Sequence, residues 1–130
     1  MWNRLRILFV MVVTLTAWAA QAGGLTIIAN PSVNLTTAEV RDVFIGEKQF
    51  AGSVKLTPVD NSAAQVAFLQ QVIQLDASRY SAVWAKKSFR DGVIPPSVKN
   101  SDAEVIGFVK STPGAIGYVT SPADGVKVIK

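Results

Sequence analysis

The sequence predicts an α/β domain in which a mixed sheet of about four strands packs with about four helices in a three-layer-like arrangement. Short runs rich in β-branched residues alternate with segments of helical spacing between residues 25 and 111. Two further strand-like runs, at residues 115–120 and 126–130, then close the chain. The sequence shows no internal repeat, and its length suits one domain.

The first 22 residues have the pattern of a secretory signal peptide. Arg4 and Arg6 precede an apolar run that ends in Ala20-Gln21-Ala22, a triplet that suits cleavage before Gly23. The run is short for a membrane span, which takes about 20 residues; an uncleaved anchor is the alternative. We therefore expect removal of residues 1–22 and export of residues 23–130 to the periplasm.

The composition excludes several classes of function. Arg4 and Arg6 are two of the 13 basic residues, so the rest of the chain carries 11 basic against nine acidic residues, too small an excess for a nucleic-acid binder. The chain contains no cysteine and no histidine, which excludes disulfides, thiol nucleophiles, imidazole bases and the usual zinc ligands. We expect no metal site, no cofactor and no membrane contact beyond the signal peptide.

Two strands and one helix are predicted in the first part of the domain. Leu25–Asn30 is mostly apolar and β-branched, as in a buried strand. A capping box at Thr36 begins a helix of about three turns, which Gly46 ends. The second strand covers Lys55–Asp60, and Pro58 places that strand at a sheet edge or a bulge.

Three helices and two strands are predicted in the second part. The first helix covers residues 62–75, and the next covers residues 77–89 after a cap at Asp76. Residues 90–100 contain Gly and two prolines and are predicted to form a loop. A capping box at Ser101 begins the last helix. The two closing strands are predicted to form a pair, joined by the turn Ser-Pro-Ala-Asp-Gly.

Apolar residues at helical or strand spacing give the predicted core. Aromatic residues at such spacing are expected to be core more often than a stacking platform; Tyr118 has two alternatives, lining a cleft or covering one end of the sheet. The predicted core residues are Val40, Val43, Phe44, Leu56, Val59, Val66, Leu69, Val72, Ile73, Tyr80, Val83, Trp84, Phe89, Val105, Phe108 and Val109.

The turn between the second strand and the next helix is the candidate binding site. A helix that starts directly after a strand presents unpaired N–H groups and the positive end of a dipole, which together hold anions. Small side chains would let a ligand approach the backbone. The alternative is that Asp60, Asn61 or Ser62 is an ordinary helix cap. The candidate ligand-binding residues are Asp60, Asn61, Ser62, Ala63, Ala64 and Gln65.

Three segments, at residues 36–50, 58–68 and 101–119, occur in an order that can be compared with known proteins. They read TTAEVRDVFIGEKQF, PVDNSAAQVAF and SDAEVIGFVKSTPGAIGYV. They resemble the central lobe of the phosphate-binding proteins of bacterial ABC importers, which have the type II periplasmic binding-protein fold. The stretch from Thr112 to Val119 is the most specific part. The resemblance implies that residues 23–130 form one lobe of this fold.

The chain departs from the pattern of that family in two ways. The family has two lobes with the substrate between them, whereas this chain has room for one. The family's second motif uses an Arg, an Asp and a Ser-Gly-Thr triplet to bind phosphate. Here the Arg position falls on Pro58, the Asp on Asp60, and the triplet on Ser62–Ala64. Only the Asp and the first Ser are kept, so the strongest phosphate contact of the family is missing.

A cation that replaces the missing arginine could come from the end of the helix over residues 77–89. Lys86, Lys87 and Arg90 stand there, and we name Lys87 and Arg90 as candidate ligand cations. The alternative is that these charges only cover the surface. Catalysis is not expected, because Ser62 has no histidine to activate it and the remaining acidic residues show no pairing.

The sequence therefore predicts an exported small-solute binding module, with phosphate or a related oxyanion as the ligand. The resemblance implies an ABC importer as the partner, and an envelope sensor is a second option. The alternative function is an envelope protein-interaction or sensing domain that no longer binds solute. Such a domain could pair with itself as a homodimer.

Overall fold

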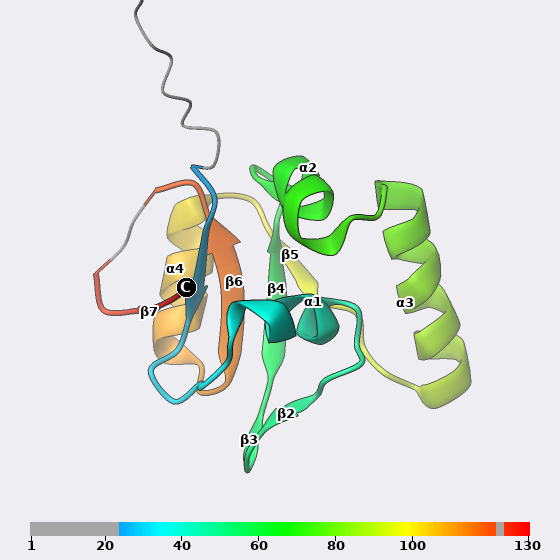
Figure 1. Ribbon diagram of the computed structural model, residues 1–130, viewed down its shortest axis with the longest axis horizontal. Helices are drawn as coiled ribbons and strands as arrows, with labels where there is room; N and C mark the ends of the chain where they lie inside the picture. The colour runs from blue at the N-terminus through cyan, green and yellow to red at the C-terminus, as the bar shows by residue number, and fades with distance from the viewer. Residues whose placement is uncertain (1–23, 122–123) are drawn as a thin grey trace, which may run out of the picture.

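The computed structural model describes residues 24–121 and 124–130 (Figure 1). The predicted signal peptide lies outside the described residues, and so does the middle of the turn that joins the last two strands. Among the residues that are described, no helix has the length and apolar character needed to cross a membrane.

Strands and helices alternate along the chain, as predicted, and close with two strands. The short helix α2 continues directly into one π-helical turn, η1. The elements are β1 (Thr26–Ala29), α1 (Thr37–Phe44), β2 (Phe50–Ala51), β3 (Val54–Lys55), β4 (Thr57–Asn61), α2 (Gln65–Phe68), η1 (Leu69–Ile73), α3 (Ala77–Asp91), β5 (Ser97–Lys99), α4 (Asp102–Ser111), β6 (Ala115–Val119) and β7 (Lys127–Ile129).

Three predicted helix starts are confirmed by their hydrogen bonds. The Asp76 carboxylate accepts from the amide of Arg79 at 2.7 Å, and the Ser101 hydroxyl accepts from the amide of Glu104 at 3.2 Å. The capping box at Thr36 also forms. These contacts are local, which is why the sequence alone reveals them.

The main sheet has five strands in the order β5-β4-β6-β1-β7, and β2 and β3 form a separate antiparallel pair. Strand β4 is parallel to β5 and β6, whereas β1 is antiparallel to β6 and β7. The predicted mixed sheet is confirmed with two corrections. Strand β5 lies in the segment that the sequence predicts to be a loop. The sequence does not predict this strand, because three residues after a double proline show no strand periodicity. Strands β6 and β7 do not pair with each other, because β1 lies between them.

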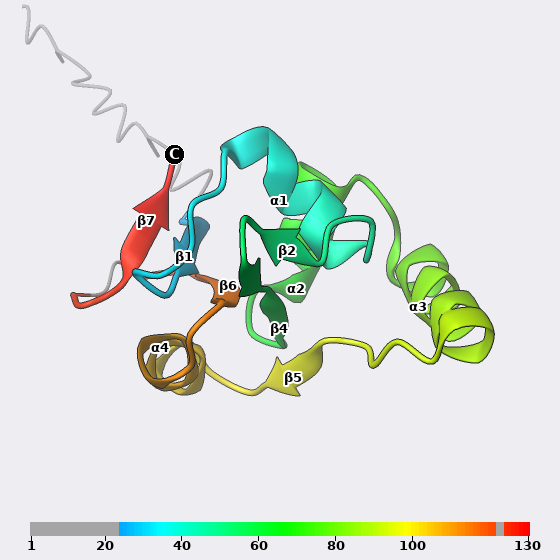
Figure 2. The ribbon, with the colours of Figure 1, turned by 90° about the horizontal axis from the view of Figure 1, so that it is seen from below.

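Helices lie on both sides of the sheet (Figure 2), and the buried apolar residues form two clusters. Helix α4 covers one face, where Val105 and Val109 pack against Ile28 and Val59. Helices α1, α2 and α3 contribute to the larger cluster on the other face. Gly117 of β6 allows α4 to come close, since a Cβ there would lie 2.7 Å from Val105 Cγ1.

Pro58 lies in an interior strand, which corrects the predicted edge or bulge. The Thr57 amide donates to the Gly114 carbonyl on the β6 side at 2.9 Å, so the Pro58 nitrogen faces the β5 side. The pairing of β4 with β5 begins only at Val59. The missing N–H of Pro58 therefore removes no hydrogen bond from the sheet.

Two predicted core residues are exposed. Val66 of α2 is 71% exposed and Phe89 of α3 is 96% exposed. Val66 lies on the exposed side of this helical segment, whereas Phe68, Leu69 and Ile73 are the buried residues. Phe89 follows the buried Trp84 by five positions, which places it about 140° around the helix from Trp84.

Candidate functional site

The parallel strands β4, β5 and β6 end at one edge of the sheet, where the candidate turn lies (Figure 1). Asn61 ends β4, and Lys99 ends β5 as its neighbour in register. Helices α2 and α4 begin directly after these two strands. Ligands of open α/β sheets bind at such an edge, outside the carboxyl ends of the strands.

Asp60 lies beneath this edge and faces the core. Its side chain is 2% exposed and accepts hydrogen bonds from the hydroxyl groups of Tyr80 at 2.9 Å and Tyr118 at 2.8 Å. Burial raises the pKa of the Asp60 carboxyl group, and the two phenol hydrogen bonds only partly oppose this. Burial and the nearby Asp60 carboxylate raise the pKa of both phenols, so they remain donors.

Tyr118 is a core residue, which excludes the alternative that its ring lines a cleft. Its ring is fully buried and stacks on Phe68 with centroids 3.8 Å apart, and Phe44 meets both rings edge-on. The predicted burial of Tyr80 and Trp84 is likewise confirmed. The aromatic groups therefore support the turn from below and offer no stacking platform at this edge.

Asn61 ties the turn to its surroundings. Its amide nitrogen donates to Asp102 Oδ1 at 2.7 Å and to the Tyr118 carbonyl at 3.0 Å, and its Oδ1 accepts from the Ala63 amide at 3.1 Å. Although burial alone would raise the pKa of Asp102, hydrogen bonds from Thr120 and Asn61 hold that pKa below its ordinary value. One fully buried side chain thus connects β4, β6 and α4.

The backbone amides of the turn are mostly used within the protein. The Ser62 amide donates to the Lys99 carbonyl at 2.8 Å, and the Ala64 amide donates to the Asn61 carbonyl at 3.0 Å. The Ala63 amide is bound to the Asn61 side chain, as described. The first helical hydrogen bond comes from Phe68, so the amides of residues 65–67 have no helical acceptor. The available donors lie slightly further along the chain than predicted.

The predicted alternative, an ordinary side-chain cap at Asp60, Asn61 or Ser62, is not found at α2 itself, although Asn61 Oδ1 accepts from the Ala63 amide in the turn before the helix. The residue before α2 is Ala64, and no side chain caps the helix. Ser62 and Ala63 are exposed to solvent. The amino end of α2 therefore has no side-chain cap, but Ala64, one of the predicted ligand-binding residues, is buried there.

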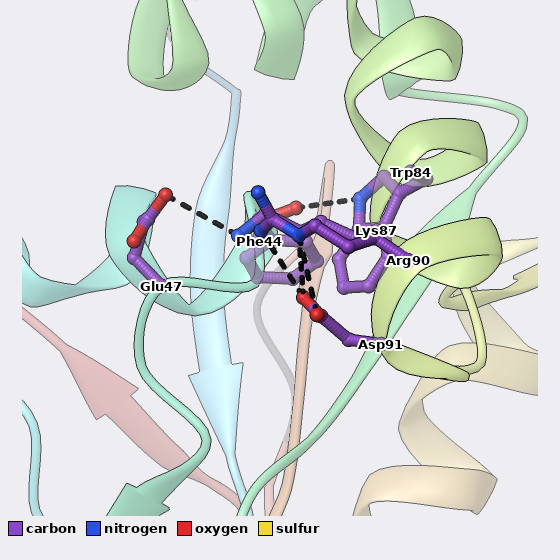
Figure 3. A network of polar contacts seen from close by, with 6 residues as sticks. All are labelled: Phe44, Glu47, Trp84, Lys87, Arg90 and Asp91. Atoms are coloured by element: carbon purple, nitrogen blue, oxygen red, sulfur yellow. Dashed lines mark hydrogen bonds and ion pairs between the residues drawn. The ribbon is translucent and has the colours of Figure 1, made fainter.

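Lys87 and Arg90 lie at the far end of the domain from this turn. Helix α3 begins near Asp60, which Tyr80 reaches, and runs toward the amino end of β4 (Figure 1). Lys87 lies 3.3 Å from Glu47, and Arg90 lies 3.1 Å from Asp91. Figure 3 shows both ion pairs. The structure does not bring these two candidate cations to the turn, and Lys86 lies on the same last turns of the helix.

Lys99 is a cationic residue beside the turn that the sequence analysis did not single out. Its carbonyl accepts from the Ser62 amide, and its Nζ lies 4.7 Å from the centroid of the Phe108 ring. It stands in the segment predicted as a loop. Only the pairing of β5 with β4 places it beside the turn.

The protonation of Asp60 should make stability depend on pH. A raised pKa in the folded state contributes stability below the unfolded pKa, and this contribution is lost as the pH rises through the folded pKa. Asp60→Asn carries no charge at any pH, and its amide can still bond both phenols. Urea unfolding should therefore show this variant as relatively more stable at about pH 7 than at about pH 4. This prediction would be contradicted if the difference in free energy of unfolding between Asp60→Asn and the wild type were the same at both pH values.

No protein-family model matches this chain, and no curated protein is significantly similar to it in sequence. Solved structures that share its fold include the following three. A candidate phosphate ABC transporter substrate-binding protein from Clostridium perfringens, solved with bound phosphate, is 17% identical with a TM-score of 0.62. An ABC-type phosphate transport receptor from Vibrio cholerae is 19% identical with a TM-score of 0.50. PstS from Borrelia burgdorferi is 20% identical with a TM-score of 0.58.

Each similarity covers 82% of this chain but only 44%, 45% and 46% of the three longer chains, respectively. The chain therefore spans less than half the length of the proteins it resembles. At these identities the similarity shows the fold. The predicted resemblance to one lobe of phosphate-binding proteins is confirmed at that level.

Proposed function

We propose that this protein is an exported module that binds a small oxyanion, with phosphate as the first candidate, at the turn between β4 and α2. The observation that carries the proposal is the open start of α2, where no side chain caps the helix. It lies at the carboxyl edge of a sheet in a fold shared with a protein solved with bound phosphate. Open helix starts at such edges favour negative ligands.

The proposed seat has hydrogen-bond donors above and a rigid support below. The Ser62 hydroxyl and the amides of residues 65–67 are the donors, and the small side chain of the exposed Ala63 leaves room beside them. Ala64 is buried in the core and does not face the seat. Asp60 and Asn61 hold the turn in place through the buried hydrogen bonds described above. In this proposal these two residues position the seat and do not touch the ligand.

Lys99 supplies the positive charge in the proposal, in place of Lys87 and Arg90. Its stem starts next to Asn61 in register, and the half-buried cation–π contact with Phe108 is worth only about 0.5–2 kcal/mol. A doubly charged anion at the turn would compete for this ammonium group. With one lysine and no arginine fork, we expect micromolar or weaker affinity.

Export and partners belong to the same proposal. Removal of residues 1–22 would place the domain in the periplasm. An ABC importer is the first partner to consider, because two of the three similar structures are named for ABC phosphate transport. An envelope sensor is the second. The role is binding without chemistry, since the chain contains no histidine or cysteine that could activate a nucleophile.

Ser62→Asp tests the seat. A carboxylate beside the free amides would occupy them and repel phosphate, so affinity should fall by about tenfold or more. Thermal stability should change little, because Ser62 is exposed. Isothermal titration with phosphate and with sulfate measures the affinity. Ser81→Asp, on the exposed side of α3, is the matched control and should bind as the wild type does. Unchanged affinity in Ser62→Asp would refute the proposal.

A second candidate is an interaction or sensing domain that no longer binds solute. The exposed Val66 favours it, because this apolar side chain stands 71% exposed beside the turn. Sedimentation with and without phosphate separates the two functions. A stable homodimer that protects Ser62 and ignores phosphate supports the interaction domain, and a monomer that releases heat with phosphate supports the binding module.

A further inference from the structure

A hollow lies at the amino ends of β4 and β5, at the opposite end of β4 from Ser62. Its volume is about 480 Å³, within the range of ligand and side-chain pockets. The end of α1, strand β3, the start of β4 and the connection from α3 to β5 surround it. None of the residues of the proposed phosphate seat lines this hollow.

The base of the hollow is apolar and its far wall is stiff. Val43, Leu56 and Trp84 form the buried base. Trp84 is fixed by a hydrogen bond from its indole nitrogen to the Phe44 carbonyl at 2.9 Å (Figure 3). Pro95 and Pro96 form part of the wall, and their rings fix the backbone φ angle. A wall that is already ordered loses little entropy when a partner binds.

Exposed apolar side chains belong to the segments that line the hollow or adjoin them. Three of the six large apolar side chains that the described residues expose are in this region: Ile94 lines the hollow, and Phe50 and Val98 adjoin the lining residues Gln49 and Ser97. Ile94 is 85% exposed, and Phe50 is 52% exposed opposite Lys55 in the β2–β3 pair. Such a rim extends beyond the reach of a small solute, which favours a polypeptide partner.

The lining also carries a positive charge without a partner. Lys48 is 3.2 Å from Glu39, and Asp91 is 3.1 Å from Arg90. Among residues 24–121 and 124–130, Lys55 forms no ion pair, although it lines the hollow beside Leu56. A partner with a carboxylate at this position would complement the charge.

We propose that this hollow, with its rim, docks an extended segment of another protein that presents an acidic side chain next to large apolar side chains. The apolar side chain enters the hollow, and the carboxylate pairs with Lys55. A second copy of this chain fits poorly, because a two-fold contact would bring the Lys55 side chains of the two copies close to each other. The inference does not depend on the proposed anion seat.

The test is a selection of random twelve-residue peptides displayed on phage against the purified protein. Selected peptides should share an acidic residue within two positions of a Phe, Leu, Ile or Trp. Synthetic labelled copies, measured by fluorescence anisotropy, should bind Lys55→Glu about tenfold or more weakly, since the variant replaces attraction by repulsion. Lys86→Glu, an exposed lysine that does not line the hollow, is the control and should bind normally.

Two further measurements keep the outcome decisive. A peptide in which the acidic residue is changed to lysine should regain binding to Lys55→Glu. Ile94→Ser should also weaken binding severalfold. The Ile94 side chain is exposed, so this substitution should not disturb folding. Failure to select peptides, equal binding by Lys55→Glu, or a dimer that occupies the hollow would each overturn the inference. Phosphate titration of the same variants should be unchanged, which separates this result from the proposed function.

Discussion

Replacing Gly114 by alanine should lower the free energy of unfolding by more than about 3 kcal/mol. Gly114 has a φ angle of +82°, and a Cβ there would lie 2.0 Å from the Lys55 carbonyl oxygen. The backbone cannot move away freely, because the Gly114 carbonyl accepts from the Thr57 amide and its own amide donates to the Ser32 hydroxyl. The left-handed conformation and the backbone clash therefore add together.

Gly107→Ala is the matched control for this prediction. Gly107 lies within α4, and a Cβ there would meet no atom within 4 Å. Alanine favours a helix over glycine, so this variant should gain up to about 1 kcal/mol. Urea unfolding followed by circular dichroism measures both variants. If the free energy of unfolding of Gly114→Ala is within about 1 kcal/mol of that of the wild type, the close approach of Gly114 to the Lys55 carbonyl does not exist in solution.

The elements that could be predicted from the sequence are those fixed by local contacts. Asp76 and Ser101 bond to amides three residues away, so their neighbours in sequence are also their partners in space. Strand β5 could not be predicted, because its three residues become a strand only through pairing with β4. The place of β1 between β6 and β7 also depends on contacts between distant segments.

The candidate site also has one part that the sequence predicts and other parts that depend on contacts between distant segments. The turn after β4 was identified from the change of pattern at Asp60-Asn61-Ser62, and it does lie at the carboxyl edge of the sheet. The distribution of its hydrogen bonds depends on Tyr118, Lys99 and Asp102, which come from other elements. The sequence predicts the ligand cation at the end of α3, but Lys87 and Arg90 lie at the other end of the domain from the turn. No spacing rule relates β5 to the turn, so Lys99 was missed.

Asn61→Ala should lower the free energy of unfolding by about 2–4 kcal/mol and remove phosphate binding from the molecules that remain folded. Asn61 is fully buried, and its side chain makes hydrogen bonds to Asp102, to the Tyr118 carbonyl and to the Ala63 amide. Alanine would leave the Asp102 carboxylate without this donor and would free the Ala63 amide. The turn would then lose the connection that fixes residues 62–65 over the sheet.

Asn100→Ala is the control for Asn61→Ala, because it removes the same kind of side chain at the same edge of the sheet. Asn100 is exposed, and only its backbone amide bonds to Glu104, so stability should change by less than about 0.5 kcal/mol. Phosphate titration at a temperature where every variant is folded separates the two effects of Asn61. Loss of binding with retained fold would support a turn that must be rigid to hold an anion. Wild-type affinity in folded Asn61→Ala would show that this buried amide does not position the ligand.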